Sequence, residues 1–270
     1  MENVKNVKNP KYPVQTVEKA LDVIDILSKD GLNGGLGISE LSSKLGMGKS
    51  TVHRLLDTLQ SYNYVEKCPN NTKYRLGWKL FEIGNLIPQQ RNLFNYDTKI
   101  LEDLCNTYGE TVNLGVRVEN SVVTISKMNA KATLIANLQV GSREPLHATA
   151  MGKSLMAEMT REEIDNLYGD TELKKFTANT ITSLDDLMLE LEKIKKQGYS
   201  IDDEEFVPGL TCIAMPVRNY RNEVVAAVSV SGPSIRLSFH KIMDIKKGLD
   251  IATKELAAFV GYMGEKKDIN

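Results

Sequence analysis

The stretch GISELSSKLGMGKSTVHRLLDTLQSYNYVEKCPNNTKYR, residues 37–75, decides the fold of the first part of the chain. It opens with a short segment in which Leu41 and Leu45 stand four residues apart, so both face the same side of a helix. Gly46 follows, and glycine readily adopts the left-handed backbone that ends a helix. We expect Ser39 to cap this helix through its hydroxyl. The pattern predicts a first helix that ends in a tight turn.

A second helix is predicted to begin near Lys49. Its apolar stripe repeats at helical spacing and consists of Val52, Leu55, Leu56 and Leu59. Off this stripe, near the helix start, lie hydrogen-bonding and cationic side chains: Lys49, Ser50, Thr51, His53 and Arg54. Side chains of these types bind base edges and phosphates in DNA complexes.

A hairpin is predicted directly after this second helix. Residues 64–66 and 73–76 look like two short strands, and the turn-forming residues 69–72 join them. A helix-turn-helix followed by a hairpin is a winged helix, in which the second helix enters the major groove. Lys73 and Arg75 on the hairpin would then contact the DNA backbone. The alternative is an ordinary helical hairpin with a solvated charged face.

Length and charge are compatible with this interpretation. The chain has 270 residues, enough for two domains with separate cores, and is 41% hydrophobic and 26% charged. Its net charge of −1 does not by itself indicate a nucleic-acid binder. Residues 1–90, however, hold twelve Lys and Arg against nine Asp and Glu, so the first third carries about +3.

The cysteines and the absence of long apolar runs bear on the compartment. Cys68, Cys105 and Cys212 are far apart and form no CxxC pair, which argues against a disulfide framework and favours a reducing cytosol. No apolar run approaches the length of a membrane span, and the polar residues 1–13 contain no apolar signal core. We therefore expect a cytoplasmic protein that does not contact membranes.

Beyond the predicted winged helix, the sequence divides at a proline. Residues 17–29 form an amphipathic helix that would complete the small first core. A helix over residues 76–87 is expected to be interrupted at Pro88, because proline cannot continue a helix. The domains expected from these features are a flexible tail (1–15), a winged helix-turn-helix domain (16–77), a linker helix (78–92) and a second domain (93–270).

The second domain shows the two-residue alternation of strands. Strands are predicted over residues 111–118, 122–128, 212–217 and 224–230. Helices are predicted over residues 93–108, 152–158, 184–196 and 239–263. The expected fold class is therefore α+β, with an antiparallel sheet flanked by helices.

Several chemical motifs are incomplete in this sequence. Two Gly-Lys-Ser triplets, at residues 48–50 and 152–154, lack the earlier glycine that a phosphate-binding loop needs. The three histidines are far apart and show no metal-ligand spacing. The acidic run at residues 202–205 is interpreted as a solvated loop. We therefore expect no cofactor and no metal site.

Polar residues near the predicted later strands indicate a small ligand site. Ser229 and Ser231 lie two apart on one strand and so face the same side. Asp202 precedes the strand that Cys212 opens, and residues 148–152 turn into a helix whose first N–H groups suit an anion. Hydroxyls, a thiol and one carboxylate in apolar surroundings suit a small polar ligand.

Taken together, these stretches resemble the isocitrate lyase regulator (IclR) family of bacterial transcription factors. The resemblance rests on residues 38–59, 74–77, 108–114, 146–153, 198–205 and 226–233 in this order and spacing. It implies a winged-helix domain, a linker helix and a GAF-like effector domain. It also implies a homodimer, or a dimer of dimers, on a palindromic operator, with a small organic acid as effector.

The resemblance also implies a set of effector-binding positions. These are Thr133, Ala136, Ala150, Met151, Asp202, Cys212, Ser229 and Ser231. Met151 stands where some relatives have alanine and would narrow the cavity, and Gly48 stands where many have proline.

The predicted function is therefore a regulator, usually a repressor in this family, of a catabolic operon. Ser229, Ser231 and backbone N–H groups would bind the carboxylate of a sugar acid or keto acid, and Asp202 would accept from a hydroxyl. Two alternatives stay open: an enzyme acting on a small acid at Asp202 and Cys212, and a scaffold whose winged helix binds another protein.

Overall fold

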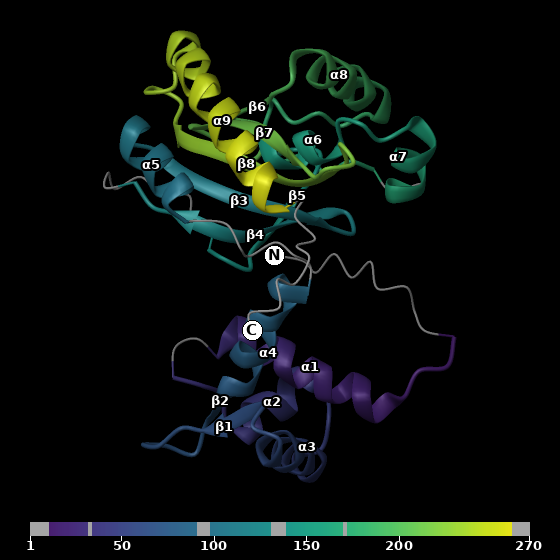
Figure 1. Ribbon diagram of the computed structural model, residues 1–270. Coiled ribbons are helices and arrows are strands. Elements are labelled where there is room, and N and C mark those ends of the chain that lie inside the picture. Colours follow the sequence, from purple (N-terminus) through teal and green to yellow (C-terminus); the bar gives the residue numbers. More distant parts are fainter. Residues whose placement is uncertain (1–10, 32–33, 91–97, 131–138, 170–171, 261–270) are drawn as a thin grey trace, which may run out of the picture. The chain divides into compact units, whose positions relative to one another are not determined.

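The computed structural model describes residues 11–31, 34–90, 98–130, 139–169 and 172–260. The chain divides into two compact units, Met1–Arg91 and Asn92–Asn270, which are shown together in Figure 1.

Unit 1 is a winged helix. Its elements are α1 (Gln15–Asp30), α2 (Ile38–Leu45), α3 (Lys49–Ser61), β1 (Val65–Lys67), β2 (Tyr74–Leu76) and α4 (Trp78–Gln90). The wing strands β1 and β2 are antiparallel, with Val65 opposite Leu76. The apolar stripes of the helices meet in one core, where Val23, Leu41 and Val52 are completely buried. The predicted winged helix-turn-helix is confirmed.

The start of α2 differs from the prediction. Gly37 is the N-cap, with the extended backbone that this position needs, and Ser39 lies exposed inside the first helical turn. Ser39 is therefore not the cap. The Glu40 carboxylate accepts the Gly37 N–H at 2.7 Å instead, and this hydrogen bond lowers the pKa of Glu40. The predicted end of the helix is correct, since Gly46 has a φ of 62°.

The helix after the wing also differs from the prediction. Helix α4 begins at Trp78 and continues through Pro88 to Gln90, so the expected interruption at Pro88 is wrong. A proline near the end of a helix removes one backbone hydrogen bond without preventing the last residues from staying helical.

Unit 2 contains a six-stranded antiparallel sheet in the order β5-β4-β3-β8-β7-β6. The strands are β3 (Thr111–Val118), β4 (Ser121–Met128), β5 (Arg143–Pro145), β6 (Ser200–Asp203), β7 (Leu210–Arg218) and β8 (Val224–Pro233). The two edge strands, β5 and β6, were not predicted. Each is short, and their proline and acidic residues have low strand propensity.

Helices cover both faces of this sheet (Figure 1). Helices α5 (Lys99–Tyr108) and α9 (Phe239–Val260) pack on one face around Leu101, Val112 and Ile245. Helix α6 (Ala150–Met156) packs on the other face, and α7 (Arg161–Tyr168) and α8 (Leu184–Gln197) extend that layer. The α+β fold class is confirmed. The predicted starts and ends at residues 93–97 and 261–263 lie outside the described residues.

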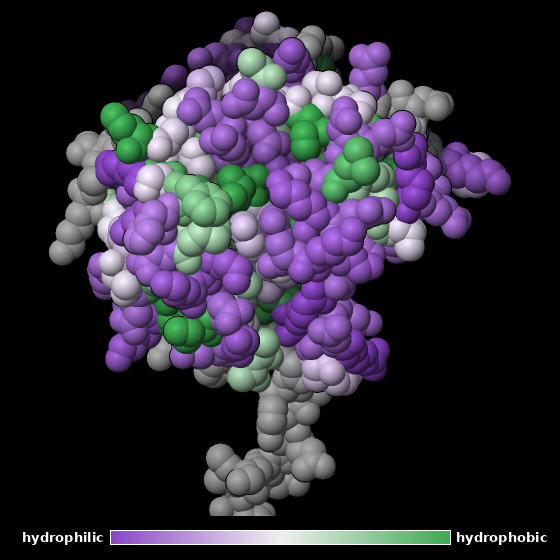
Figure 2. All heavy atoms as spheres, turned by 90° about the horizontal axis from the view of Figure 1, so that it is seen from above, coloured by the Kyte–Doolittle hydropathy of each residue, from purple (hydrophilic) through white to green (hydrophobic). Residues whose placement is uncertain are grey.

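The face shown in Figure 2 is mainly hydrophilic, and its apolar side chains form small separate groups. None of the helices in the described ranges is long and apolar enough to cross a bilayer.

Candidate DNA interface and effector site

Helix α3 presents a polar face to solvent. The apolar residues Val52, Leu55 and Leu56 are buried. The predicted DNA-contact residues of this helix are all exposed: Lys49, Ser50, Thr51, His53 and Arg54. In the described part of the chain, neither of the two cationic side chains among them, Lys49 and Arg54, pairs with a carboxylate. This face therefore has charges and hydrogen-bonding groups that are available to a phosphate or a base edge.

The first turn of α3 has no side-chain cap. Gly48 is its N-cap and offers no side-chain hydrogen bond to the first turn. The first N–H groups of a helix have no acceptor within the helix, so they can bind a phosphate. The φ of Gly48 is −62°, which is also the φ of proline. The backbone at this position therefore has the same conformation with glycine as it would have with the proline of many relatives.

The wing cations are paired, and Arg75 is exposed whereas Lys73 is only partly exposed. Lys73 lies 3.5 Å from a Glu40 carboxylate oxygen, and Arg75 lies 2.6 Å from Glu66. Surface ion pairs of this kind are weak, so a phosphate can replace the carboxylate. Lys67, exposed on β1 opposite Tyr74, was missed by the sequence analysis, although its position on the wing was a usable signal.

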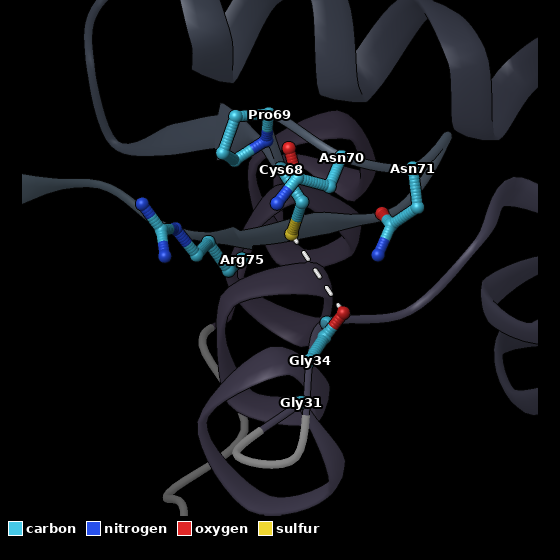
Figure 3. A pocket seen from close by; sticks show the side chains of 8 residues that line it. Gly31, Gly34, Cys68, Pro69, Asn70, Asn71 and Arg75 are labelled. Atoms are coloured by element: carbon cyan, nitrogen blue, oxygen red, sulfur yellow. Dashed lines mark hydrogen bonds between the residues drawn. The ribbon is translucent and has the colours of Figure 1, made fainter.

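A pocket of about 270 Å³ lies between the wing and the α1–α2 connection (Figure 3). Its lining consists of Gly31, Gly34, Gly35, Cys68, Pro69, Asn70, Asn71 and Arg75. The Cys68 thiol donates to the Gly34 carbonyl at 3.7 Å, the dashed line in Figure 3. This contact holds the base of the wing against the connection. We assign no separate ligand to the pocket, because its charged group, Arg75, belongs to the wing cations predicted to contact DNA.

In unit 2, the predicted effector residues that the structure describes gather on one side of the sheet. Strand register places Ser231 opposite Cys212, and Cys212 opposite Asp202, so the three side chains share a face. Ala150 and Met151, at the start of α6, pack into the core on this face. All of these residues and Ser229 are buried. Thr133 and Ala136 lie outside the described residues.

Asn113 completes this group, and the sequence analysis missed it. It lies on β3 directly opposite Ser229, and its Nδ2 donates to the hydroxyls of Ser229 and Ser231 at 3.4 Å each. Its Oδ1 is buried and has no hydrogen-bond partner among the described residues. The signal was the alternation of β3, which puts a polar Asn113 between the apolar Val112 and Leu114.

Met151 fills space above the sheet. The Met151 sulfur lies 3.0 Å from the position that a Cβ atom at Gly115 would occupy. Met151 therefore packs directly against the backbone of β3 at this glycine. That Met151 narrows an effector cavity stays a prediction.

The acidic run is not a solvated loop, and that interpretation was wrong. Asp202 belongs to β6 and is 2% exposed, and Glu205 is 7% exposed. Asp202 accepts the Glu205 N–H at 2.7 Å, while Glu205 pairs with Lys153, a fully buried cation on α6. Burial is the largest cause that raises the pKa of Asp202, to about 7.

A second polar pair lies on the same face, toward β5. The Thr124 hydroxyl of β4 donates to Glu144 Oε1 at 3.1 Å, and both residues are buried. Burial raises the pKa of Glu144, while the Thr124 hydrogen bond and the nearby Lys127 charge oppose this change. Glu144 was not identified from the sequence, because β5 is too short to show a strand pattern. Thr124 lies on the predicted strand β4 but was not singled out.

The chemistry of Cys212 does not suit catalysis. Burial raises the pKa of its thiol well above the ordinary value, and the Asp202 charge acts in the same direction. A nucleophilic cysteine needs the opposite change. In the described ranges, no three His, Cys, Asp or Glu side chains are arranged to hold a metal ion.

Comparison with known proteins gives consistent matches over both units. Residues 16–69 match the IclR helix-turn-helix domain, and residues 87–257 match the C-terminal domain of the bacterial transcriptional regulator IclR. The chain is 36% identical to the HTH-type transcriptional regulator KdgR of Escherichia coli K12 over 242 residues, covering 90% of this chain and 92% of KdgR.

It is 34% identical to the HTH-type transcriptional regulator XynR of the same strain over 243 residues, covering 90% of this chain and 96% of XynR. The crystal structure of the Thermotoga maritima IclR superposes with a TM-score of 0.78 at 30% identity, over 93% of this chain and 100% of that one. These proteins are regulators rather than enzymes, which overturns the alternative of an enzyme at Asp202 and Cys212.

Proposed function

We propose, because this chain belongs to the IclR family of bacterial transcriptional regulators, that it represses a catabolic operon in the cytoplasm. A small organic acid, either a sugar acid or a keto acid, binds unit 2 and changes the affinity for the operator. The observation that supports the effector proposal is Asn113 Oδ1, which is buried beside the hydroxyls of Ser229 and Ser231 and has no hydrogen-bond partner among the described residues.

The DNA contacts proposed follow from the exposed face of α3. Ser50, Thr51, His53 and Arg54 read or position the operator, and Lys49 contacts a phosphate. These side chains are exposed, and the cations among them have no carboxylate partner among the described residues. Lys73 and Arg75 contact the backbone from the wing after exchanging Glu40 and Glu66 for phosphates.

The effector contacts proposed are centred on β8. Ser229 and Ser231 donate to the ligand carboxylate together with the first N–H groups of α6, at Ala150 and Met151. Asp202 accepts from a ligand hydroxyl, since two ionised carboxylates that face each other repel. Cys212 and Met151 form part of the apolar wall, to which Thr133 and Ala136 are also assigned.

The domain assignment stays a proposal as well. Residues 16–77 bind DNA, residues 78–92 link the domains, and residues 93–270 bind the effector, after a tail at residues 1–15. The protein acts as a homodimer or a dimer of dimers on a palindromic operator, because two copies of a winged helix recognise two half-sites.

The test is titration of the protein against its own upstream DNA at two salt concentrations, with and without a panel of sugar acids and keto acids. We expect salt-dependent, specific binding that one acid relieves. Absence of specific binding under every condition would refute the regulator. Binding that no acid changes would refute the effector proposal alone.

Ser231→Ala tests the effector site directly. The variant should bind the operator like the wild type and lose about tenfold or more in effector affinity, because a hydrogen bond to the charged carboxylate is removed. Isothermal titration with the acid that emerges from the panel measures this loss. Loss of operator binding as well would indicate misfolding, and an unchanged effector affinity would exclude Ser231.

A further inference from the structure

The two cations of wing strand β2 are each held by a carboxylate from a different element. Glu66 lies directly opposite Arg75 in the β1–β2 register, and its Oε1 accepts a hydrogen bond from Arg75 Nε at 2.6 Å. Glu40 of α2 lies 3.5 Å from the Lys73 ammonium. Because each contact joins opposite charges, neither cation of β2 has its full charge available to another anion.

Glu40 is held in place independently of Lys73. Its Oε2 atom accepts the Gly37 N–H at 2.7 Å, and the same oxygen faces Lys73. The Gly37 hydrogen bond is the largest cause that lowers the pKa of Glu40, and the Lys73 charge acts in the same direction. Glu40 is therefore ionised at neutral pH, and the start of α2 keeps it beside the wing when Lys73 binds elsewhere.

The cations of α3 show the opposite arrangement. Lys49 and Arg54 are exposed, and the structure gives neither of them a carboxylate partner within its described ranges. A DNA phosphate can therefore approach these side chains without breaking an existing ion pair. On the wing, an ion pair has to be broken first.

A phosphate that contacts Lys73 or Arg75 replaces the carboxylate that is already there. Exposed ion pairs are weak, so replacement is possible, but it offsets part of the free energy that the phosphate contact supplies. The displaced carboxylate then lies near the phosphate, and the two negative charges repel each other. Both effects lower the affinity for DNA. Neither depends on base sequence, because the phosphates are the same along the duplex.

We infer that Glu40 and Glu66 compete with DNA phosphates for the wing cations and so hold down the affinity of the protein for DNA of any sequence. This inference rests on the proposed function, in which Lys73 and Arg75 contact the DNA backbone. It gives the two carboxylates a role in setting affinity rather than in reading bases. A moderate DNA affinity lets a modest coupling free energy from the effector release the operator.

Fluorescence anisotropy of the full chain tests the competition, with its upstream DNA and with unrelated DNA of the same length. Glu66→Gln and Glu40→Gln remove the charge but keep the side-chain size and a hydrogen-bond acceptor. At about 0.1 M salt, each should tighten binding to both DNAs about twofold to fivefold, and the double variant about tenfold. The ratio of the two affinities should keep its wild-type value, and the gain should shrink as salt rises.

A double-mutant cycle separates competition from general repulsion of DNA. In the Arg75→Gln background no cation remains for Glu66 to hold, so the gain in binding free energy from Glu66→Gln should fall to about half or less. Glu82→Gln is the matched control, because it removes the carboxylate of an exposed ion pair with Lys79 on α4 that is not assigned to DNA. It should leave both DNA affinities unchanged.

The outcomes separate this inference from the proposed function. If the wild type binds no DNA, the regulator fails and the inference fails with it. If the wild type binds, the competition alone is refuted by glutamine variants that bind no more tightly, or by a gain from Glu66→Gln that persists in full without Arg75. Circular dichroism checks the fold of each variant. Glu66→Gln decides if Glu40→Gln does not fold, because Glu40 also accepts the Gly37 N–H.

Discussion

At the scale of single residues, the protein keeps polar groups buried around one face of a sheet at a cost in stability. Asp202 is the clearest case, because burial raises its pKa to about 7 while its unfolded value is near 3.9. Such a group favours the folded state only while it carries its proton. A ligand that donates to Asp202 would offset part of this cost, which links ligand binding to stability.

The pH dependence of stability follows from this shift. Between about pH 4 and pH 7 the folded protein retains a proton that the unfolded chain has released, so stability falls as pH rises through this window. Asp202→Asn cannot ionise and still accepts the Glu205 N–H. It should therefore exceed the wild type by about 2–4 kcal/mol at pH 8, a difference that shrinks toward pH 4.

Urea unfolding followed by circular dichroism at several pH values measures this difference. Asp203→Asn, which changes the exposed neighbouring carboxyl on the same strand, is the control and should follow the wild-type curve. A gap between Asp202→Asn and the wild type that stays constant with pH would show that Asp202 does not titrate in this range.

At the scale of elements, α3 and the wing differ in how their cations are held. The α3 cations have no carboxylate partner in the described ranges, whereas Lys73 and Arg75 are each paired. Glu40 both satisfies the start of α2 and pairs with Lys73, so one carboxylate connects the helix-turn-helix to the wing.

Lys73→Ala should weaken binding to all DNA sequences alike and reduce the salt slope by about 1, as for any lost phosphate contact. Fluorescence anisotropy with operator and unrelated DNA at several salt concentrations measures the slope. Lys79→Ala, which removes a paired cation on α4, is the control. An unchanged slope for Lys73→Ala would remove Lys73 from the DNA contacts.

Helices and strands long enough to show a regular pattern of apolar residues could be predicted from the sequence. Short strands that form only because they pair with a neighbouring strand could not. The stripe of α3 and the alternation of β3 are long enough to specify a helix and a strand from local sequence. Strand β6 contains two aspartates and forms because it pairs with β7. Such pairing depends on residues distant in sequence, so no local pattern shows it.

The candidate site shows the same limit. The two serines of β8 were visible because they lie on one recognisable strand. Asn113 and Glu144 join them only through the order of the strands, which brings β3 and β5 to the same sheet. A polar residue at an inward position of a strand becomes meaningful once its partners across the sheet are known.

At the scale of the whole molecule, unit 1 exposes apolar side chains that its own fold leaves uncovered. At α1, the N-cap residue Val14 and the helical residues Val17 and Leu21 recur at helical spacing and are each more than half exposed. On α4, Trp78 and Phe81 are similarly exposed and stack edge to face with a centroid distance of 5.9 Å. Single exposed apolar residues are ordinary, but rows of them along two helices indicate a partner surface.

If a second copy covers these rows, Val17→Glu should prevent the two winged helices from binding a palindrome together. The wild type should bind a full palindrome far more tightly than one half-site, because the second contact is effectively intramolecular. Val17→Glu should lose about a hundredfold on the palindrome and keep its half-site affinity. Leu189→Glu, at an exposed leucine on α8, is the control. Fluorescence anisotropy measures the affinity for the palindrome and for the half-site, and sedimentation measures the oligomeric state of each variant. If Val17→Glu still prefers the palindrome as strongly as the wild type, α1 is not part of the interface.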